Sequence, residues 1–129
     1  MTPHTPVAPE CKWEQRPGRG AGEVMDIKLI YITAGTLEEA QKIGRTLVEE
    51  RLVACVNILD NVTSLYWWEG KIQNDREVIL IAKTTRNMVR QVIERVKLIH
   101  SYACPCIVSF SVDAGNPAFL SWVEMEVRS

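Results

Sequence analysis

The stretch SLYWWEGKIQNDREVILIAKTT, residues 64–85, determines the fold that this sequence predicts. Strand-forming residues dominate both of its ends, and Glu69-Gly70 between them is a turn signal, so the stretch predicts a β-hairpin. Its most aromatic part, LYWW at 65–68, adjoins the turn, where a hairpin normally meets water. Three large aromatic side chains at such a position need a surface that covers them.

Strand and helix patterns flank the hairpin on both sides. Short runs rich in β-branched residues predict strands, and apolar residues repeating every three or four positions predict helices. The predicted strands are 27–33, 53–68, 71–83 and 105–112, and the predicted helices are 36–51, 85–99 and 117–127. This order predicts an α+β, ferredoxin-like βαββαβ fold with a long central hairpin and a C-terminal helix.

Polar residues mark the starts of the helices. Thr36 with Glu39 three residues later has the spacing of a capping box, and Thr85 is placed to cap the second helix. Asn116 followed by Pro117 is a typical start for the third. In the first long strand Val56 and Ile58 share one face, and the same alternation continues through Val62, Ser64, Tyr66 and Trp68.

The composition is that of an ordinary globular domain and excludes some classes of function. The 129 residues carry a net charge of -1, which argues against a nucleic-acid-binding protein that neutralises phosphates. No apolar run approaches the roughly 20 residues of a membrane span. The four cysteines are few and irregularly spaced, so we expect reduced thiols in a cytoplasmic protein with no membrane partner.

The N-terminal segment differs from the rest of the chain. Residues 1–24 hold four of the six prolines and three of the seven glycines. Such a segment cannot bury enough apolar surface to offset the entropy lost on ordering. We therefore expect a disordered extension at 1–24 and a folded domain at 25–129, with Met25 directly before the first strand.

The predicted hairpin is longer than the helices that would cover it. Strands of 13–16 residues extend roughly 45–50 Å at ~3.3 Å per residue, whereas helices of about 15 residues extend roughly 23 Å. The distal, aromatic half would then be an exposed apolar patch unless a second subunit covers it. The alternative is a bent or bulged hairpin that folds back onto its own sheet, with the bend at Asp60-Asn61 or Asn74-Asp75.

Five sequence blocks, in order, resemble the CutA family of divalent-cation tolerance proteins. The resemblance extends from about residue 25 to 128, and its longest block, at 64–72, is highly specific. The blocks are ACVNI at 54–58, SLYWWEGKI at 64–72, KTT at 83–85, HSY at 100–102 and LSW at 120–122. The resemblance implies a homotrimer similar to PII-type signalling proteins, with long hairpins that pair between subunits. It also implies a role in tolerance of copper and other divalent metals. The sequence offers no nucleophile-base pair, so we expect a protein without enzymatic activity.

The sequence departs from the family pattern at the start of the last strand. Relatives usually have His-Pro-Tyr-Glu-x-Pro-Glu-Ile, whereas this chain has HSYACPCI at 100–107, with thiols gained and carboxylates lost. Cys104 and Cys106, together with His100, are candidate ligands for a soft metal ion such as copper or zinc. The resemblance adds Cys55, at a position linked to metal in relatives. The alternatives are small buried thiols for the cysteines and a helix cap for His100.

A second group of residues is predicted to line a ligand cleft or subunit interface. Lysines at strand ends attract anions, so an anion or small-molecule pocket between subunits is one interpretation and purely structural pairing is the other. The group comprises Tyr66, Trp67, Trp68, Lys71, Lys83, Tyr102 and Trp122. The leading hypothesis is metal binding, and the alternative is a PII-like sensor of small molecules or anions. An enzyme that uses Lys and Tyr in the cleft ranks last.

Overall fold

The computed structural model describes Trp13 and residues 26–128. The α+β class predicted from the sequence is confirmed, because a four-stranded antiparallel sheet is combined with α-helices. The disorder expected at 1–24 concerns residues that, apart from Trp13, lie outside this part of the chain. The elements are β1 (Ile27–Ala34), α1 (Leu37–Glu49), β2 (Cys55–Trp68), β3 (Lys71–Thr85), the 3₁₀ turn η1 (Arg86–Met88), α2 (Val89–Ile99), β4 (Ile107–Ser111) and α3 (Pro117–Glu126).

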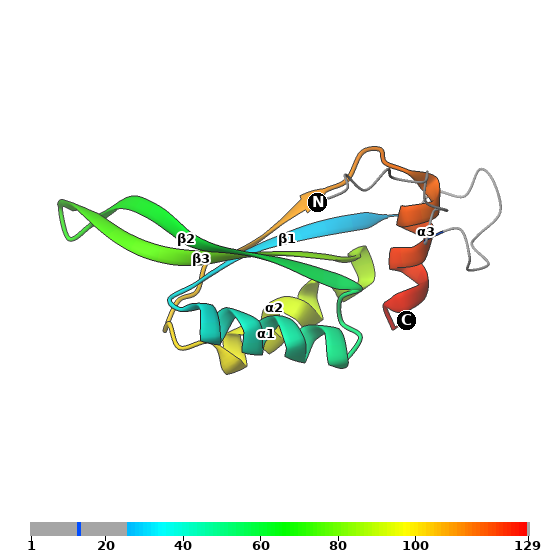
Figure 1. Ribbon diagram of the computed structural model, residues 1–129, viewed down its shortest axis with the longest axis horizontal. Helices are drawn as coiled ribbons and strands as arrows, with labels where there is room; N and C mark the ends of the chain where they lie inside the picture. The colour runs from blue at the N-terminus through cyan, green and yellow to red at the C-terminus, as the bar shows by residue number, and fades with distance from the viewer. Residues whose placement is uncertain (1–12, 14–25, 129) are drawn as a thin grey trace, which may run out of the picture.

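The sheet has the strand order β2-β3-β1-β4, so β2 and β4 are its edges within one chain. Helices α1 and α2 lie side by side against one face of the sheet, and α3 stands at the end opposite the hairpin tip (Figure 1). Residues that face each other across antiparallel strands point to the same side. The buried side therefore runs through Ile32, Leu80 and Ile58, which are in register with one another.

Helix starts follow the sequence signals in two of three cases. The Thr36 hydroxyl accepts a hydrogen bond from the Glu39 N–H at 3.1 Å, and the Asn116 side chain accepts one from the Ala118 N–H at 3.1 Å. Thr85 makes no capping hydrogen bond, so that prediction is wrong. The reason is that Thr85 is still paired with Ile27 in the sheet, and the 3₁₀ turn η1 intervenes before α2 begins.

The hairpin of β2 and β3 projects beyond the helices as a long ribbon (Figure 1). Its turn is the expected Glu69-Gly70 pair, and both residues have positive φ, 50° and 76°. Two central residues with positive φ match the right-handed twist of the flanking strands. The ribbon does not fold back onto the sheet, which removes that alternative for a single chain. None of the helices in the described part is long and apolar enough to span a membrane.

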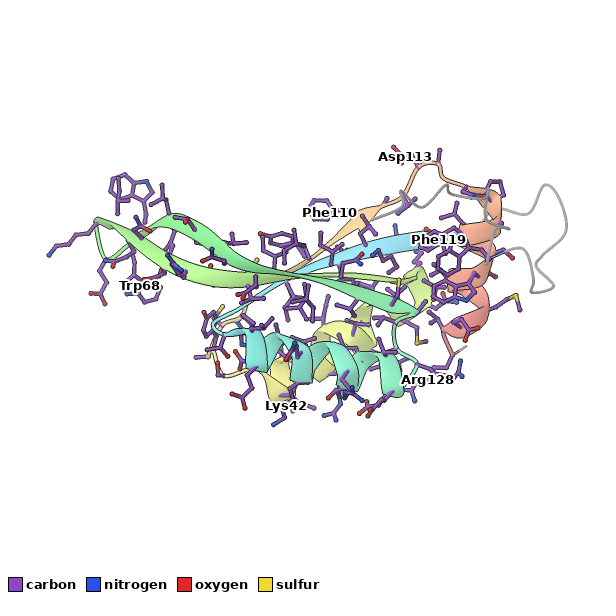
Figure 2. All side chains as sticks on the ribbon, in the orientation of Figure 1. Lys42, Trp68, Phe110, Asp113, Phe119 and Arg128 are labelled. Atoms are coloured by element: carbon purple, nitrogen blue, oxygen red, sulfur yellow. The ribbon has the colours of Figure 1, made fainter. Side chains whose placement is uncertain are left out.

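Trp13 packs against α3 at the other end of the molecule. Its ring centroid lies 4.9 Å from that of Phe119 and 4.4 Å from that of Trp122. Phe119 and Trp122 are themselves stacked, with centroids 5.9 Å apart. Trp122 therefore belongs to an aromatic cluster on α3, far from the hairpin tip that carries Trp68 (Figure 2).

Candidate functional site

A β-bulge in β2 determines which side chains reach the candidate site. Leu59 pairs with Ile79, but Val62 pairs with Glu77, so β2 contains one extra residue between these pairs. Asn61 takes a positive φ of 61° at the bulge, and its side-chain oxygen accepts a hydrogen bond from Arg76 Nη1 at 2.7 Å. One extra residue moves all later side chains to the opposite face.

The predicted continuous alternation along β2 is therefore wrong. Val56 and Ile58 face α1, where the Cβ of a residue at Gly44 would lie 3.5 Å from each of them. Beyond the bulge the even-numbered residues lie on the opposite side of the sheet, opposite Glu77, Asp75, Gln73 and Lys71 of β3. These even-numbered residues are Val62, Ser64, Tyr66 and Trp68.

A cavity of about 640 Å³ lies on this second side of the sheet. Its wall is built by the distal hairpin, by Thr33 at the end of β1, and by the loop between α2 and β4. The lining residues are Thr33, Tyr66, Trp68, Gln73, Asp75, Glu77, Tyr102, Ala103, Cys104 and Cys106. Among these described residues two are carboxylates and none is a lysine or an arginine, so the lining favours cations over anions.

Each of the two carboxylates in the cavity accepts a hydrogen bond from a tyrosine hydroxyl. The Tyr66 hydroxyl donates to Asp75 Oδ2, and the Tyr102 hydroxyl donates to Glu77 Oε2 at 3.2 Å. The hydrogen bond to Asp75 raises the pKa of Tyr66. Partial burial, together with the charge of Glu77, raises the pKa of Tyr102 to about 12. Both phenols therefore remain protonated donors at neutral pH, and they fix the orientation of the carboxylates.

The loop between α2 and β4 is anchored at His100. This residue is buried, its Nε2 lies 2.7 Å from the Thr33 carbonyl oxygen, and its Nδ1 accepts from the Tyr102 N–H at 3.0 Å. These bonds place the proton on Nε2. Because both ring nitrogens are occupied, His100 acts as a structural cap at the end of α2.

Glu39 and Gly35 hold the same loop from the side of α1. The Glu39 carboxylate accepts from Ser101 N at 2.8 Å and from Ser101 Oγ at 3.0 Å. Burial opposes ionisation of Glu39, but these hydrogen bonds prevail and lower its pKa. A Cβ at Gly35 would lie 3.1 Å from the Tyr102 hydroxyl, so this position brings the backbone close to the phenol.

The four residues predicted to bind metal are not gathered at one place. Cys104 and Cys106 both line the cavity, but His100 and Cys55 are not among its lining residues. Strands β3 and β1 stand between β2, where Cys55 begins the strand, and β4. Burial raises the pKa of the Cys55 thiol, although the charge of Lys83 opposes the shift. Within the described residues no group of three or more His, Cys, Asp or Glu side chains is arranged to hold a metal ion.

The predicted cleft residues are divided in the same way. Tyr66, Tyr102 and Trp68 line the cavity, whereas the lysines do not. Lys83 Nζ donates to Asn57 Oδ1 instead, and Lys71 lies at the turn opposite Trp68. Among its described lining residues the cavity therefore has none of the cations that the anion-sensor alternative requires. Trp67 is 72% exposed on the other side of the ribbon.

The sequence reasoning missed the carboxylates of the cavity, Asp75 and Glu77. A signal was available, because Gln73, Asp75 and Glu77 alternate along the strand that pairs with the aromatic run. Polar residues at period 2 opposite aromatic residues indicate a mixed face rather than a solvated one. The predicted two-residue turn at Glu69-Gly70 by itself places Tyr66 opposite Gln73, so the hairpin register already indicated this shared face.

Comparison with known proteins gives consistent matches. The sequence profile of the family described as CutA1 divalent ion tolerance protein matches residues 28–126. The divalent-cation tolerance protein CutA of Archaeoglobus fulgidus is 44% identical over 99 residues, 77% of this chain and 96% of the relative. The corresponding Thermus thermophilus protein is 42% identical over 96 residues, 74% of this chain and 93% of the relative. This chain covers less of two eukaryotic relatives, 64% of mouse Protein CutA and 56% of rice chloroplastic Protein CutA 1.

Solved structures match the fold at the same level. CutA1 from Oryza sativa superposes with a TM-score of 0.79 at 34% identity, over 81% of this chain and 95% of the other. CutA from Xylella fastidiosa gives a TM-score of 0.78 at 38% identity, over 80% and 99%. The family resemblance of the five sequence blocks is therefore confirmed, and the chain belongs to the CutA1 divalent ion tolerance protein family.

Proposed function

We propose that three copies of this chain form a ferredoxin-like trimer that binds divalent cations such as copper or zinc. In this proposal the protein contributes to metal tolerance by binding rather than by catalysis. The names of its relatives support the link to divalent cations. The observation that carries the proposal is the apolar surface that one chain leaves exposed.

The side of the sheet opposite α1 and α2 supports assembly. Register places Tyr31 between Ile81 and Val108 there, and Leu59 pairs with Ile79 on the same side. Leu59, Val108 and Phe110 are 46%, 44% and 54% exposed. Phe110 lies on the side away from Lys42 of α1 (Figure 2). A sheet face of this composition is typical of a surface buried between subunits.

The hairpin tip supports the same conclusion. Leu65, Trp67, Trp68 and Ile72 are all more than 60% exposed. Strand pairing with a neighbouring copy would cover these side chains and also satisfy the open edges of the ribbon. The proposed trimer would thus supply the surface that covers the aromatic run at 65–68.

The cavity supports cation binding. Asp75 and Glu77 present oxygen ligands oriented by phenol hydroxyls, and carboxylates suit divalent ions. A neighbouring hairpin in the proposed trimer would bring further ligands toward this wall, because a single chain supplies only part of a coordination shell.

Two measurements test the proposal. Light scattering at micromolar concentration is expected to give about 44 kDa, three times the 14.6 kDa chain. Calorimetric titration with Cu²⁺ or Zn²⁺ is expected to show binding that Asp75→Asn/Glu77→Gln weakens at least tenfold, while the exposed control Glu49→Gln leaves it unchanged. A well-behaved monomer, or equal binding by both variants, would contradict the proposal.

We also propose a cytoplasmic location, in which free thiols remain reduced. The structure contains free cysteines at positions 55, 104 and 106. Cell fractionation of the tagged protein is expected to recover it with cytoplasmic markers, and recovery in an oxidising compartment would contradict this placement.

A further inference from the structure

Two free thiols open into the same cavity. Cys104 and Cys106 are both exposed, and both line the 640 Å³ space next to Tyr102. They are separated by a single proline, so their relative placement is constrained by the backbone.

Pro105 gives the pair its geometry. Proline fixes its own φ and disfavours the helical region for the residue before it, which narrows the conformations open to Cys104. The Cys106 carbonyl accepts from the Thr33 N–H at 3.4 Å, which joins this end of the segment to β1. Residues two apart along the chain have Cα atoms no more than about 6.6 Å apart, and both cysteines line the same cavity. Both thiols therefore approach the cavity from one wall.

We propose that Cys104 and Cys106 together bind one monovalent copper ion as a two-coordinate dithiolate site. The inference rests on the proposed function only in placing cation binding in this cavity, and it names a different ion and different ligands. On binding, each thiol loses its proton to solvent and forms one Cu–S bond. Copper enters as Cu(I) and stays Cu(I), so no oxidant or reductant is required.

Two thiolates on their own suit Cu(I) better than zinc. Structural zinc requires four ligands, whereas the described residues contain no suitably arranged group of three or more ligand side chains. His100, the nearest candidate for a third ligand in sequence, has both ring nitrogens in hydrogen bonds. Soft thiolates favour Cu(I), and this d¹⁰ ion accepts two ligands in linear coordination.

Distances favour an ion over a disulfide. Metal–sulfur bonds of about 2.3 Å place two thiolates about 4.6 Å apart across a shared ion. A disulfide needs a much closer approach of the sulfurs, about 2.05 Å, with converging Cβ vectors. The side chains need only lean toward each other to hold the ion.

The surroundings suit a cation. Asp75 and Glu77 line the same cavity and add negative charge, while hydrogen bonds from Tyr66 and Tyr102 limit their repulsion of the thiolates. The phenols remain protonated at neutral pH. Their hydrogen bonds therefore still reduce the repulsion between the carboxylates and the thiolates when the ion binds.

The test is an anaerobic titration of the reduced full chain with Cu(I) in competition with a chromophoric Cu(I) chelator. We expect one high-affinity ion per chain, and X-ray absorption with two sulfur neighbours. Loss of a metal's outer-shell partner alone costs 10–100-fold in affinity, so Cys104→Ser and Cys106→Ser are each expected to cost more than about 100-fold. The matched control Cys55→Ser is expected to bind Cu(I) as the parent chain does.

Several results would overturn the site. Unchanged Cu(I) affinity in both serine variants would do so, as would loss in Cys55→Ser alone, or a Cys104–Cys106 disulfide that persists in millimolar glutathione. Binding of divalent ions, measured by calorimetry on the same variants, is expected to be unchanged. Failure of the dithiol site is thus distinguishable from failure of the proposed function, which depends on Asp75 and Glu77.

Discussion

The two halves of the β2–β3 ribbon have similar strand patterns but differ in how far their side chains are buried. Before the bulge, Leu80 and Val78 of β3 are 0% and 3% exposed beneath the helices, with Ile58 packed against them. Beyond it, Leu65 and Ile72 are 67% and 64% exposed. The proximal half is covered on one face by the helices of its own chain, whereas that chain leaves the distal half exposed. One extra residue at Asp60-Asn61 marks the change, since it re-aims every later side chain of β2.

Deletion of Asn61 is the most direct way to break this comparison. The turn at Glu69-Gly70 pairs Tyr66 with Gln73, so without the extra residue either Val56 and Ile58 turn away from the helices or the turn itself must move and carry Tyr66 off the Asp75 face. We expect loss of the cavity and of assembly, seen as a monomer or aggregate in light scattering and as no measurable Cu²⁺ binding.

A matched variant separates the bulge from the side chain at position 61. Asn61→Gly keeps a residue that readily adopts positive φ but removes the hydrogen bond from Arg76. We expect it to remain assembled, with stability lower by about 1 kcal/mol. Equal behaviour of the deletion and the glycine variant would show that the bulge does not set the register.

The second prediction contrasts one leucine from each half. Leu80→Ala removes a fully buried side chain, so we expect it to lower the free energy of unfolding by about 2–5 kcal/mol. Leu65→Ala is expected to leave chain folding nearly unchanged and to weaken assembly instead. Chemical denaturation and sedimentation at one fixed protein concentration distinguish the two effects, and a reversed pattern would contradict the division of the ribbon.

This division explains what could be predicted from sequence. Local patterns placed the strands and helices, because β-branched alternation and the caps at Thr36 and Asn116 act over a few residues. The excess length of the hairpin was also visible, since it follows from counting residues. Asp60-Asn61 was one of two places predicted for a bend or bulge, and the bulge lies there. Its reversal of the β2 faces was not predicted, because the sequence pattern suggests one continuous alternation. Asp75 and Glu77 were missed as site residues, although the turn at Glu69-Gly70 already places their face with Tyr66.

The site residues depended on distant contacts that a sequence does not display. Cys104 and Cys106 were found from their departure from the family pattern, and the structure places both in the cavity. His100 was a candidate ligand only while its partners, Thr33 and Tyr102, were unknown. Lys83 was similarly assigned to a pocket before its bond to Asn57 across the ladder was visible.

The third prediction concerns pH and tests whether the distal half is coupled to the loop after α2. The folded pKa of Tyr102, about 12, is above its ordinary value of 10.0, so the stabilisation it provides is fully present below pH 10 and is lost as the pH rises toward 12. Glu77→Gln removes one cause of the shift and is expected to move the tyrosine titration toward pH 10. Tyrosinate absorbance checks this, with Tyr102→Phe to identify the transition; an unmoved titration would show that Tyr102 and Glu77 are not coupled.

The fourth and smallest prediction sharpens the account of the proximal half. Gly44 lies in the middle of α1, and a Cβ there would lie 3.5 Å from Val56 and Ile58 and 3.7 Å from Leu80, which are ordinary contact distances. Glycine inside a helix costs roughly 0.5–1 kcal/mol relative to alanine. Gly44→Ala is therefore expected to stabilise the chain by about that amount in thermal or chemical denaturation. A bulkier Gly44→Leu change should instead push α1 off the sheet and destabilise it, because the contacts already made by a Cβ leave no room for further atoms. If leucine were tolerated as well as alanine, the helix layer would not be closely packed on the proximal half, and the contrast with the uncovered distal half would lose its basis.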